Sequence, residues 1–203
     1  MNVAVIGSGN IGGTLAKKWA AAGHDVSLGV RDPGKPDVVD LVRAMGGRSR
    51  AATASDATAE GEVVVFAIPG EAVGGTLAGI GPRLGGKVIV DATNNMGGGP
   101  MNSVATIASA APGAHVYRAF NSLGWENFQD TTFKGVQGDL FYAGPEGPSQ
   151  ATVERLISDV GLRPIRVGGA DQAGLVDSVT GLWFALAIGQ GMGRRLAFKV
   201  LTP

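Results

Sequence analysis

The chain opens with an apolar run, a glycine loop and a helical stretch in immediate succession. Residues 2–6 lead directly into Gly7-Ser8-Gly9-Asn10-Ile11-Gly12, and helical spacing continues over 11–22. In this pattern the first glycine allows a tight turn, the second lets the backbone approach a pyrophosphate, and the third permits close helix–strand contact. The free N–H groups at the helix start and the helix dipole favour an anion there, and Ser8 and Asn10 can add side-chain donors. The opening therefore predicts a dinucleotide-binding unit.

The end of the second expected strand bears on which dinucleotide would bind. Residues 25–29 end at Gly29, where an NAD-binding domain places a carboxylate that accepts the ribose hydroxyls, and Arg31 follows. A guanidinium without that carboxylate suits a 2′-phosphate, and Lys35 can supply a second cation. The carboxylate of Asp32 is evidence against a bound 2′-phosphate, unless its role is only to cap the turn before Pro33. We expect NADP(H), with a solvated surface arginine as the alternative for Arg31.

Apolar runs alternate with helical stretches along most of the chain, which predicts an α/β fold. We expect a Rossmann-like, doubly wound parallel sheet with a small C-terminal helical region. Strands are expected at 2–6, 25–29, 50–54, 62–68, 87–91, 115–120, 140–143 and 163–167, and helices at 11–22, 36–45, 71–84, 103–110 and 152–160. Everything from Asp171 onward is expected to be helical. Residues 1–170 would form the NADP-binding domain with the substrate-cleft elements, and residues 171–203 a C-terminal helical segment.

Three later strand ends are expected to border the same crevice. In open α/β sheets, ligands bind outside the carboxyl ends of the strands. One strand end reads Ala67-Ile68-Pro69, the next is followed by Asn94, and a third is followed by Asn121. We expect the first group and Asn94 to contact the cofactor, and Pro69, Asn94 and Asn121 to contact the substrate. The alternative for Asn121 is an Asx turn that opens the helix near Gly124.

Composition excludes several function classes. Lys and Arg number 17, as do Asp and Glu, so no net charge points to nucleic acid. The chain has no cysteine and only two histidines, so we expect no metal site. No secretory pattern is recognised at the start, and the apolar run 182–188 is shorter than the ~20 residues of a membrane span. We therefore expect a cytoplasmic protein with small-molecule partners.

No pair of residues suggests a nucleophile and its base. His24 follows the helix-closing Gly23, His115 opens a strand, and Asp91 at a strand end is expected to be a buried, hydrogen-bonded structural acid. Hydride transfer between two bound cofactors needs positioning more than acid–base catalysis. The sequence therefore favours a redox enzyme with no catalytic side chain of its own.

At this point the chain resembles a known family, the NADPH-dependent deazaflavin-coenzyme reductases (8-hydroxy-5-deazaflavin:NADPH oxidoreductases). The similar motifs are Gly7-Ser8-Gly9-Asn10-Ile11-Gly12, Gly23-His24, Gly29-Val30-Arg31, Asp91-Ala92-Thr93-Asn94, Arg118-Ala119-Phe120-Asn121-Ser122 and Leu182-Trp183. The resemblance implies an NADP-dependent oxidoreductase that transfers hydride between NADPH and an F420-type deazaflavin coenzyme. Two positions depart from the family: Val30 replaces a serine that helps hold the 2′-phosphate, and Arg118 replaces the usual lysine.

Two other functions stay open on the sequence. One is reduction of a small imine or carbonyl compound, although imine reductases usually have a longer helical C-terminal domain. The other is a non-catalytic NADP(H) sensor that acts on a partner through its C-terminal helix. Residues 175–201 carry large apolar side chains, including Trp183 and Phe184, on more than one helix face. We expect part of this surface to form a homodimer, with a monomer as the alternative.

Overall fold

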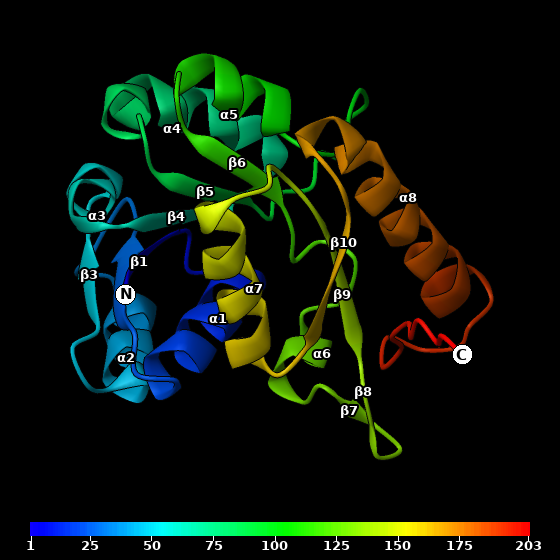
Figure 1. Cartoon of the computed structure of the whole chain (residues 1–203). Helices are drawn as coiled ribbons and strands as arrows, with labels where there is room; N and C mark the ends of the chain where they lie inside the picture. The colour runs from blue at the N-terminus through cyan, green and yellow to red at the C-terminus, as the bar shows by residue number, and fades with distance from the viewer.

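Eight strands form one sheet in the computed structural model, which describes residues 1–203 (Figure 1). The strands are β1 Asn2–Ile6, β2 Asp25–Gly29, β3 Arg50–Ala52, β4 Val63–Phe66, β5 Val88–Asp91, β6 His115–Arg118, β9 Asp139–Ala143 and β10 Arg163–Gly168. Their order is β10-β9-β6-β5-β4-β1-β2-β3. The last six run 6-5-4-1-2-3, which is the strand order of dinucleotide-binding sheets. The expected Rossmann-like α/β fold is confirmed.

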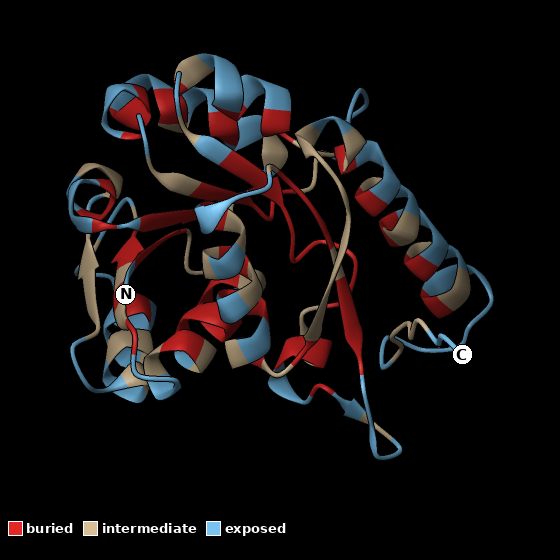
Figure 2. Ribbon diagram, viewed as in Figure 1, coloured by how far each residue is buried: buried red, intermediate tan, exposed pale blue.

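Helices cover both faces of this sheet. They are α1 Asn10–Ala21, α2 Pro36–Met45, α3 Ala54–Glu60, α4 Val73–Ile80, α5 Val104–Ala110, α6 Glu126–Gln129, α7 Pro148–Val160 and α8 Ala173–Phe184. Alternate residues of β1 face different cores: Val3 packs in the cluster that holds Trp19 of α1, and Ala4 in the cluster that holds Leu77 of α4. Figure 2 shows the central strands buried between the two layers, as parallel strands should be.

Strands β9 and β10, at one end of the sheet, depart from the predicted parallel arrangement. Strand β9 meets β6 in a single antiparallel pair, Arg118 with Ala143, whereas β9 and β10 are parallel to each other. The segment between β6 and β9 holds only the short α6 and a hairpin of β7 Thr132–Phe133 and β8 Val136–Gln137. A parallel return requires a longer crossover, usually a helix, so the chain comes back in the opposite direction.

The central strands end in register. Ile6 pairs with Gly29 and with Phe66, Phe66 pairs with Asp91, and Asp91 pairs with Arg118. One row of residues therefore crosses the sheet at its carboxyl edge, and the chain leaves every strand of this row on the same side. This register brings the predicted site segments, which are far apart in the sequence, to one edge.

The C-terminal region differs from the expected continuous helix. Helix α8 continues into a π-helical turn, Ala185–Gly189, and residues 190–203 contain no helix. Gly191 and Gly193 adopt φ +67° and +85°, values that glycine adopts readily and that end the helix. The sequence predicted no helix between the expected strands 50–54 and 62–68, but residues 54–60 form helix α3, and its N-cap Thr53 accepts a hydrogen bond from the N–H of Asp56.

The final residues return to the sheet. Trp183 of α8 is buried and its indole N–H donates to the carbonyl of Leu196 at 2.9 Å. The buried carboxylate of Asp139 accepts from Arg163 Nε at 2.8 Å, Lys199 Nζ at 2.9 Å and the Val200 N–H at 2.7 Å. Burial alone would raise the pKa of Asp139, but these hydrogen bonds outweigh it and lower the pKa from 3.8 to about 2.

The helical run that contains α8 is apolar. Ala170–Gly189 is 20 residues long with a mean hydropathy of 1.2, enough by length and composition alone to cross a membrane. Core helices of globular proteins pass the same test. This run carries Asp177, which forms an ion pair with the buried Arg118 of β6 at 2.8 Å, so one face of α8 is bound to the sheet.

Asp139 gives a pH-dependent prediction for the tail. Its lowered pKa stabilises the fold fully above pH 3.8, by on the order of 2 kcal/mol, and this contribution disappears as the pH falls toward 2. Asp139→Asn should therefore lower the free energy of unfolding at pH 7, and the deficit should shrink below pH 4. Urea denaturation of both proteins from pH 7 to pH 3 measures this. A deficit that stays constant with pH would contradict the assignment.

Candidate functional site

A cleft of about 1140 Å³ runs along the carboxyl edge of β1, β2 and β4. Eight of the residues proposed from the sequence line it, namely Gly7, Ser8, Gly9, Arg31, Lys35, Ala67, Ile68 and Pro69. Asn10, Ile11 and Gly12 form the first turn of α1 directly behind the glycine loop. Asn94 and Asn121 do not line this cavity and belong to a neighbouring polar network.

The three loop glycines have different surroundings. Gly7 has φ +108°, and a Cβ there would lie 2.5 Å from the carbonyl oxygen of Ala67. A Cβ on Gly12 would collide with the carbonyl oxygen of Gly7. A Cβ on Gly9 would meet nothing within 4 Å. Gly7 and Gly12 are thus required for packing, whereas Gly9 faces open space in the cleft, where a bulky phosphate group would lie.

The start of α1 fits that phosphate. Gly9 is the N-cap and no side chain accepts the N–H groups of the first turn. Such N–H groups, with the positive end of the helix dipole, bind anions. Residues 9–12 therefore offer backbone donors beside Gly9, the loop glycine that faces open space.

The corner beyond β2 carries two cations, Arg31 and Lys35. Arg31 is exposed and forms no ion pair within the protein, while Lys35 pairs with Asp37 at 2.9 Å and lowers the pKa of that carboxyl. Asp32 accepts from the N–H of Gly34 at 3.0 Å, which is the turn-capping role considered for it. Arg31 is consequently the free cation of this corner.

Sequence reasoning missed the opposite wall of the cleft. Thr53 and Ser55 line it where β3 meets α3, and Gly75, Thr76 and Gly79 line it from α4. The expected strand 50–54 ends at the same edge as β2, so its last residues could have been named as candidates. The residues of α4 carry no recognisable motif, because their backbone and small side chains only form a surface.

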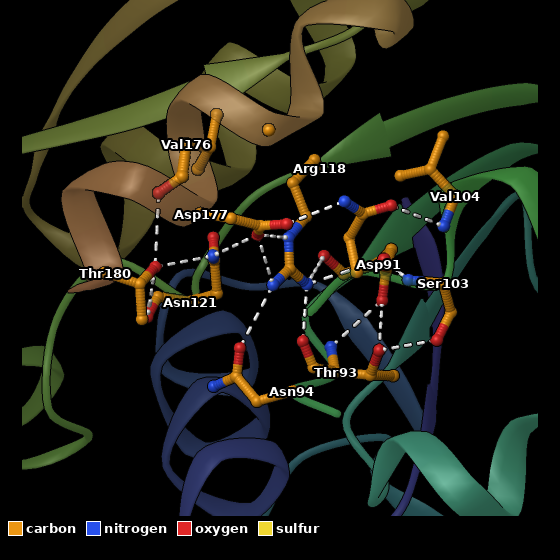
Figure 3. A network of polar contacts seen from close by, with 12 residues as sticks. Asp91, Thr93, Asn94, Ser103, Val104, Arg118, Asn121, Val176, Asp177 and Thr180 are labelled. Carbon is orange, nitrogen blue, oxygen red and sulfur yellow. Dashed lines mark hydrogen bonds and ion pairs between the residues drawn. The ribbon is translucent and has the colours of Figure 1, made fainter. Parts of the chain in front are cut away.

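A buried polar network lies beside the cleft at the ends of β5 and β6 (Figure 3). Asp91 is fully buried and accepts from the N–H of Thr93 and from the N–H of Ser103, consistent with the structural role expected for it. Arg118 is also fully buried and donates to Asn94 Oδ1 at 3.0 Å. The carbonyl of Asn94 accepts from Gly70 N–H at 3.4 Å, one residue from the cleft-lining Pro69.

Asn121 belongs to the same network. Its side chain is buried, and its Nδ2 donates to Thr180 Oγ1 at 2.8 Å and to Asp177 Oδ1 at 3.2 Å, both on α8. The preceding Phe120 has φ +63°, an unusual value for a non-glycine residue that typically costs 1–3 kcal/mol. Helix α8 therefore binds the side chain of Asn121, which the sequence had assigned to the substrate cleft.

Comparison with known proteins agrees with this geometry. Residues 2–95 match the family described as NADP oxidoreductase, coenzyme F420-dependent. Two F420-dependent NADP reductases, from Methanothermobacter thermautotrophicus and Methanothermobacter marburgensis, are 29% and 27% identical to this chain over 93% of its length, covering 90% and 93% of those proteins. The expected family resemblance is confirmed.

Solved structures extend the likeness to the whole fold. A candidate F420-dependent NADP reductase from Arthrobacter sp. FB24 has a TM-score of 0.86 and 23% identity, with 100% of both chains covered. A reductive aminase from Aspergillus terreus, solved with NADPH and ethyl levulinate, has a TM-score of 0.70 and 26% identity. The match covers 93% of this chain but 62% of the aminase.

The glycine geometry predicts opposite effects for two matched variants. Gly9→Val should keep the fold and abolish dinucleotide binding, because its side chain enters the open space above the helix start. Gly12→Val should destabilise the fold itself, since it collides with the backbone of Gly7. Thermal unfolding and NADPH titration separate the two. A folded Gly9→Val protein with unchanged NADPH affinity would rule out this site.

Proposed function

We propose that this protein is an NADP(H)-dependent oxidoreductase that transfers hydride directly between NADPH and an F420-type deazaflavin coenzyme. The observation that carries the proposal is the likeness to F420-dependent NADP reductases over 93% of the chain, joined to a cleft in which Gly9, the open glycine of the loop, lies at the start of α1. Bound side by side, the nicotinamide and the deazaflavin supply the redox chemistry themselves.

The protein's part is to bind and orient. In this proposal residues 7–12 hold the pyrophosphate, and Arg31 holds the 2′-phosphate with help from Lys35. The strand end also disfavours a carboxylate, because a Cβ on Gly29 would lie 2.6 Å from Ile6 Cδ1 and 3.2 Å from Ala54 Cα. An aspartate side chain at this position would require the end of the Ile6 side chain to move and Ala54 to give by a few tenths of an ångström. The tight fit around Gly29 agrees with NADP, which needs no carboxylate there.

Ala67, Ile68, Pro69 and Asn94 would contact the nicotinamide half of the cofactor, and Pro69, Asn94 and Asn121 the deazaflavin. These residues are assigned because they follow β4, β5 and β6, whose ends are in register beside the cleft. None of them transfers a proton in this scheme. Their role is to place the two rings at reacting distance, which can account for a large part of a rate enhancement.

The alternatives are weaker on specific observations. The match covers 90% and 93% of the two F420-dependent NADP reductases but 62% of the reductive aminase. A non-catalytic sensor would bind NADPH without turnover. Mixing the protein with NADPH and the oxidised deazaflavin distinguishes the two: loss of the deazaflavin's visible absorbance supports the enzyme, and binding without turnover with any acceptor supports the sensor.

Cofactor choice should depend on Arg31. Arg31→Ala should reduce kcat/KM for NADPH by roughly 10- to 150-fold, the value of a lost charge-assisted pair, and leave NADH nearly unchanged. Arg43→Ala is a matched control, because Arg43 is equally exposed but pairs with Asp40 on α2. Equal losses with both cofactors would show that Arg31 does not contact the 2′-phosphate.

We also propose a cytoplasmic homodimer formed through residues 171–203. Leu175 and Leu182 of α8 are about half exposed, at 51% and 50%, and Ile188 and Met192 continue the apolar surface beyond it. Large exposed apolar surfaces usually mark an interface, and two-fold dimers are the commonest solution. A second copy covers this face without the bilayer that its hydropathy alone would also allow.

Light scattering at micromolar concentration tests the dimer. The wild type should have the mass of two chains, and Leu182→Lys should have the mass of one, because the charge falls in the contact. Val39→Lys, on a comparably exposed apolar position of α2, should leave the mass unchanged. A wild-type mass of one chain would exclude the dimer. Loss of protein into the membrane fraction of the expressing cell would exclude the cytoplasmic assignment.

A further inference from the structure

The guanidinium of Arg118 is the centre of the buried network. It donates from Nε to Asp177 Oδ1 at 2.9 Å, from Nη2 to Asn94 Oδ1 at 3.0 Å, and from Nη1 to the carbonyls of Asp91 and Thr93. Its side chain has no exposed surface. A planar group with five N–H donors can serve all four acceptors at once, whereas a lysine ammonium has only three donors on one atom.

The carboxylate that mainly balances the positive charge of Arg118 is Asp177 of α8. Asp91 lies 3.4 Å from Nη1, but its oxygens already accept from Thr93 and Ser103. Asp177 lies 2.8 Å from Nη2 and is the nearer carboxylate. Removing one member of a buried ion pair leaves an uncompensated charge and is strongly unfavourable. Docking of α8 is therefore coupled to the position of Arg118 at the end of β6.

This ion pair fixes the side-chain amide of Asn94. A guanidinium can only donate, so the atom that faces it must be the amide oxygen. The amide nitrogen then points away from Arg118, as Figure 3 shows, and it forms no hydrogen bond within the protein. Asn94 is partly exposed and its backbone joins Gly70 beside the cleft-lining Pro69. Its N–H₂ group is thus a free donor beside the cleft.

We propose that Arg118 and Asp177 are positioning residues, which hold Asn94 so that its Nδ2 donates to a carbonyl oxygen of a bound ring. This inference rests on the proposed function. The carbonyl chemistry is common to two sources, the carboxamide of the nicotinamide and the ring carbonyl of a deazaflavin. The C-terminal helix is then part of the binding site through Asp177, although none of its residues lines the cavity.

The decisive variant is Asn94→Asp, which keeps an oxygen against Arg118 but replaces the outward donor with an acceptor. It should weaken the ligand whose carbonyl it contacts by at least about tenfold. NADPH affinity by fluorescence titration and the KM for the oxidised deazaflavin identify which ring that is. Binding of 2′,5′-ADP, which has no nicotinamide, should not change. Wild-type values for both NADPH and the deazaflavin would overturn the proposal.

Positioning is tested by a double-mutant cycle. Arg118→Lys should weaken the same ligand about tenfold in the wild-type background and less than twofold in an Asn94→Ala background, since its effect passes through Asn94. Arg163→Lys, which disturbs the ion pair with Asp139 away from the cleft, should change stability without changing affinity. Equal losses in both backgrounds would leave Arg118 a purely structural residue. If Arg118→Lys does not fold, Asp177→Asn replaces it in the cycle.

If the proposed function is wrong, the experiments give a result that differs from failure of the Asn94 inference. A wild-type protein that binds NADPH but reduces no deazaflavin would remove the proposed acceptor. The NADPH titration of Asn94→Asp would then decide the inference alone: a tenfold loss supports it, and an unchanged affinity overturns it.

Discussion

The site depends on how closely the glycine loop packs against the ends of the central strands. Gly7 lies against the carbonyl of Ala67 after β4, and Gly12 lies against the carbonyl of Gly7 itself. These contacts leave no room for side chains, and they turn the N-terminus of α1 toward the carboxyl edge of the sheet. Because β1, β2 and β4 end in register, Arg31 after β2 and Pro69 after β4 both line the cleft at this edge of the sheet. Loop packing and strand register together produce the cleft.

The second half of the site is held by buried charge. Arg118 and Asp177 join the end of β6 to α8, and each also contacts an asparagine, Asn94 and Asn121 respectively. Buried ion pairs seldom add much net stability, but they are costly to break and they specify one arrangement. In this protein that arrangement fixes amide groups beside the cleft. The arginine that departs from the family's lysine is well suited to this, because it reaches four acceptors.

The sequence located the glycine-loop side of the cleft, but it did not indicate the polar network beside the cleft. The glycine loop and Arg31 follow local rules that link residue type to backbone position, and their places in the cleft agree with those rules. Asn121 was named from its strand end alone, and nothing local indicates that Asp177 and Thr180 of a distant helix engage its amide. The antiparallel turn of β9 was missed because pairing direction depends on the connection rather than on the strand. The non-helical tail was missed because its apolar side chains favour a helix, whereas the positive φ of Gly191 and Gly193 ends it.

The central claim is that hydride passes directly between two cofactors that the protein only positions. Isotope transfer tests it: the protein is mixed with NADPH deuterated at nicotinamide C4, in the stereoisomer that is transferred, and with the oxidised deazaflavin in ordinary water. The reduced deazaflavin is then examined by mass spectrometry. Direct transfer predicts one deuterium, carried at C5, in a single orientation. Reduced deazaflavin without deuterium, formed from either stereoisomer of the labelled NADPH, would contradict the account.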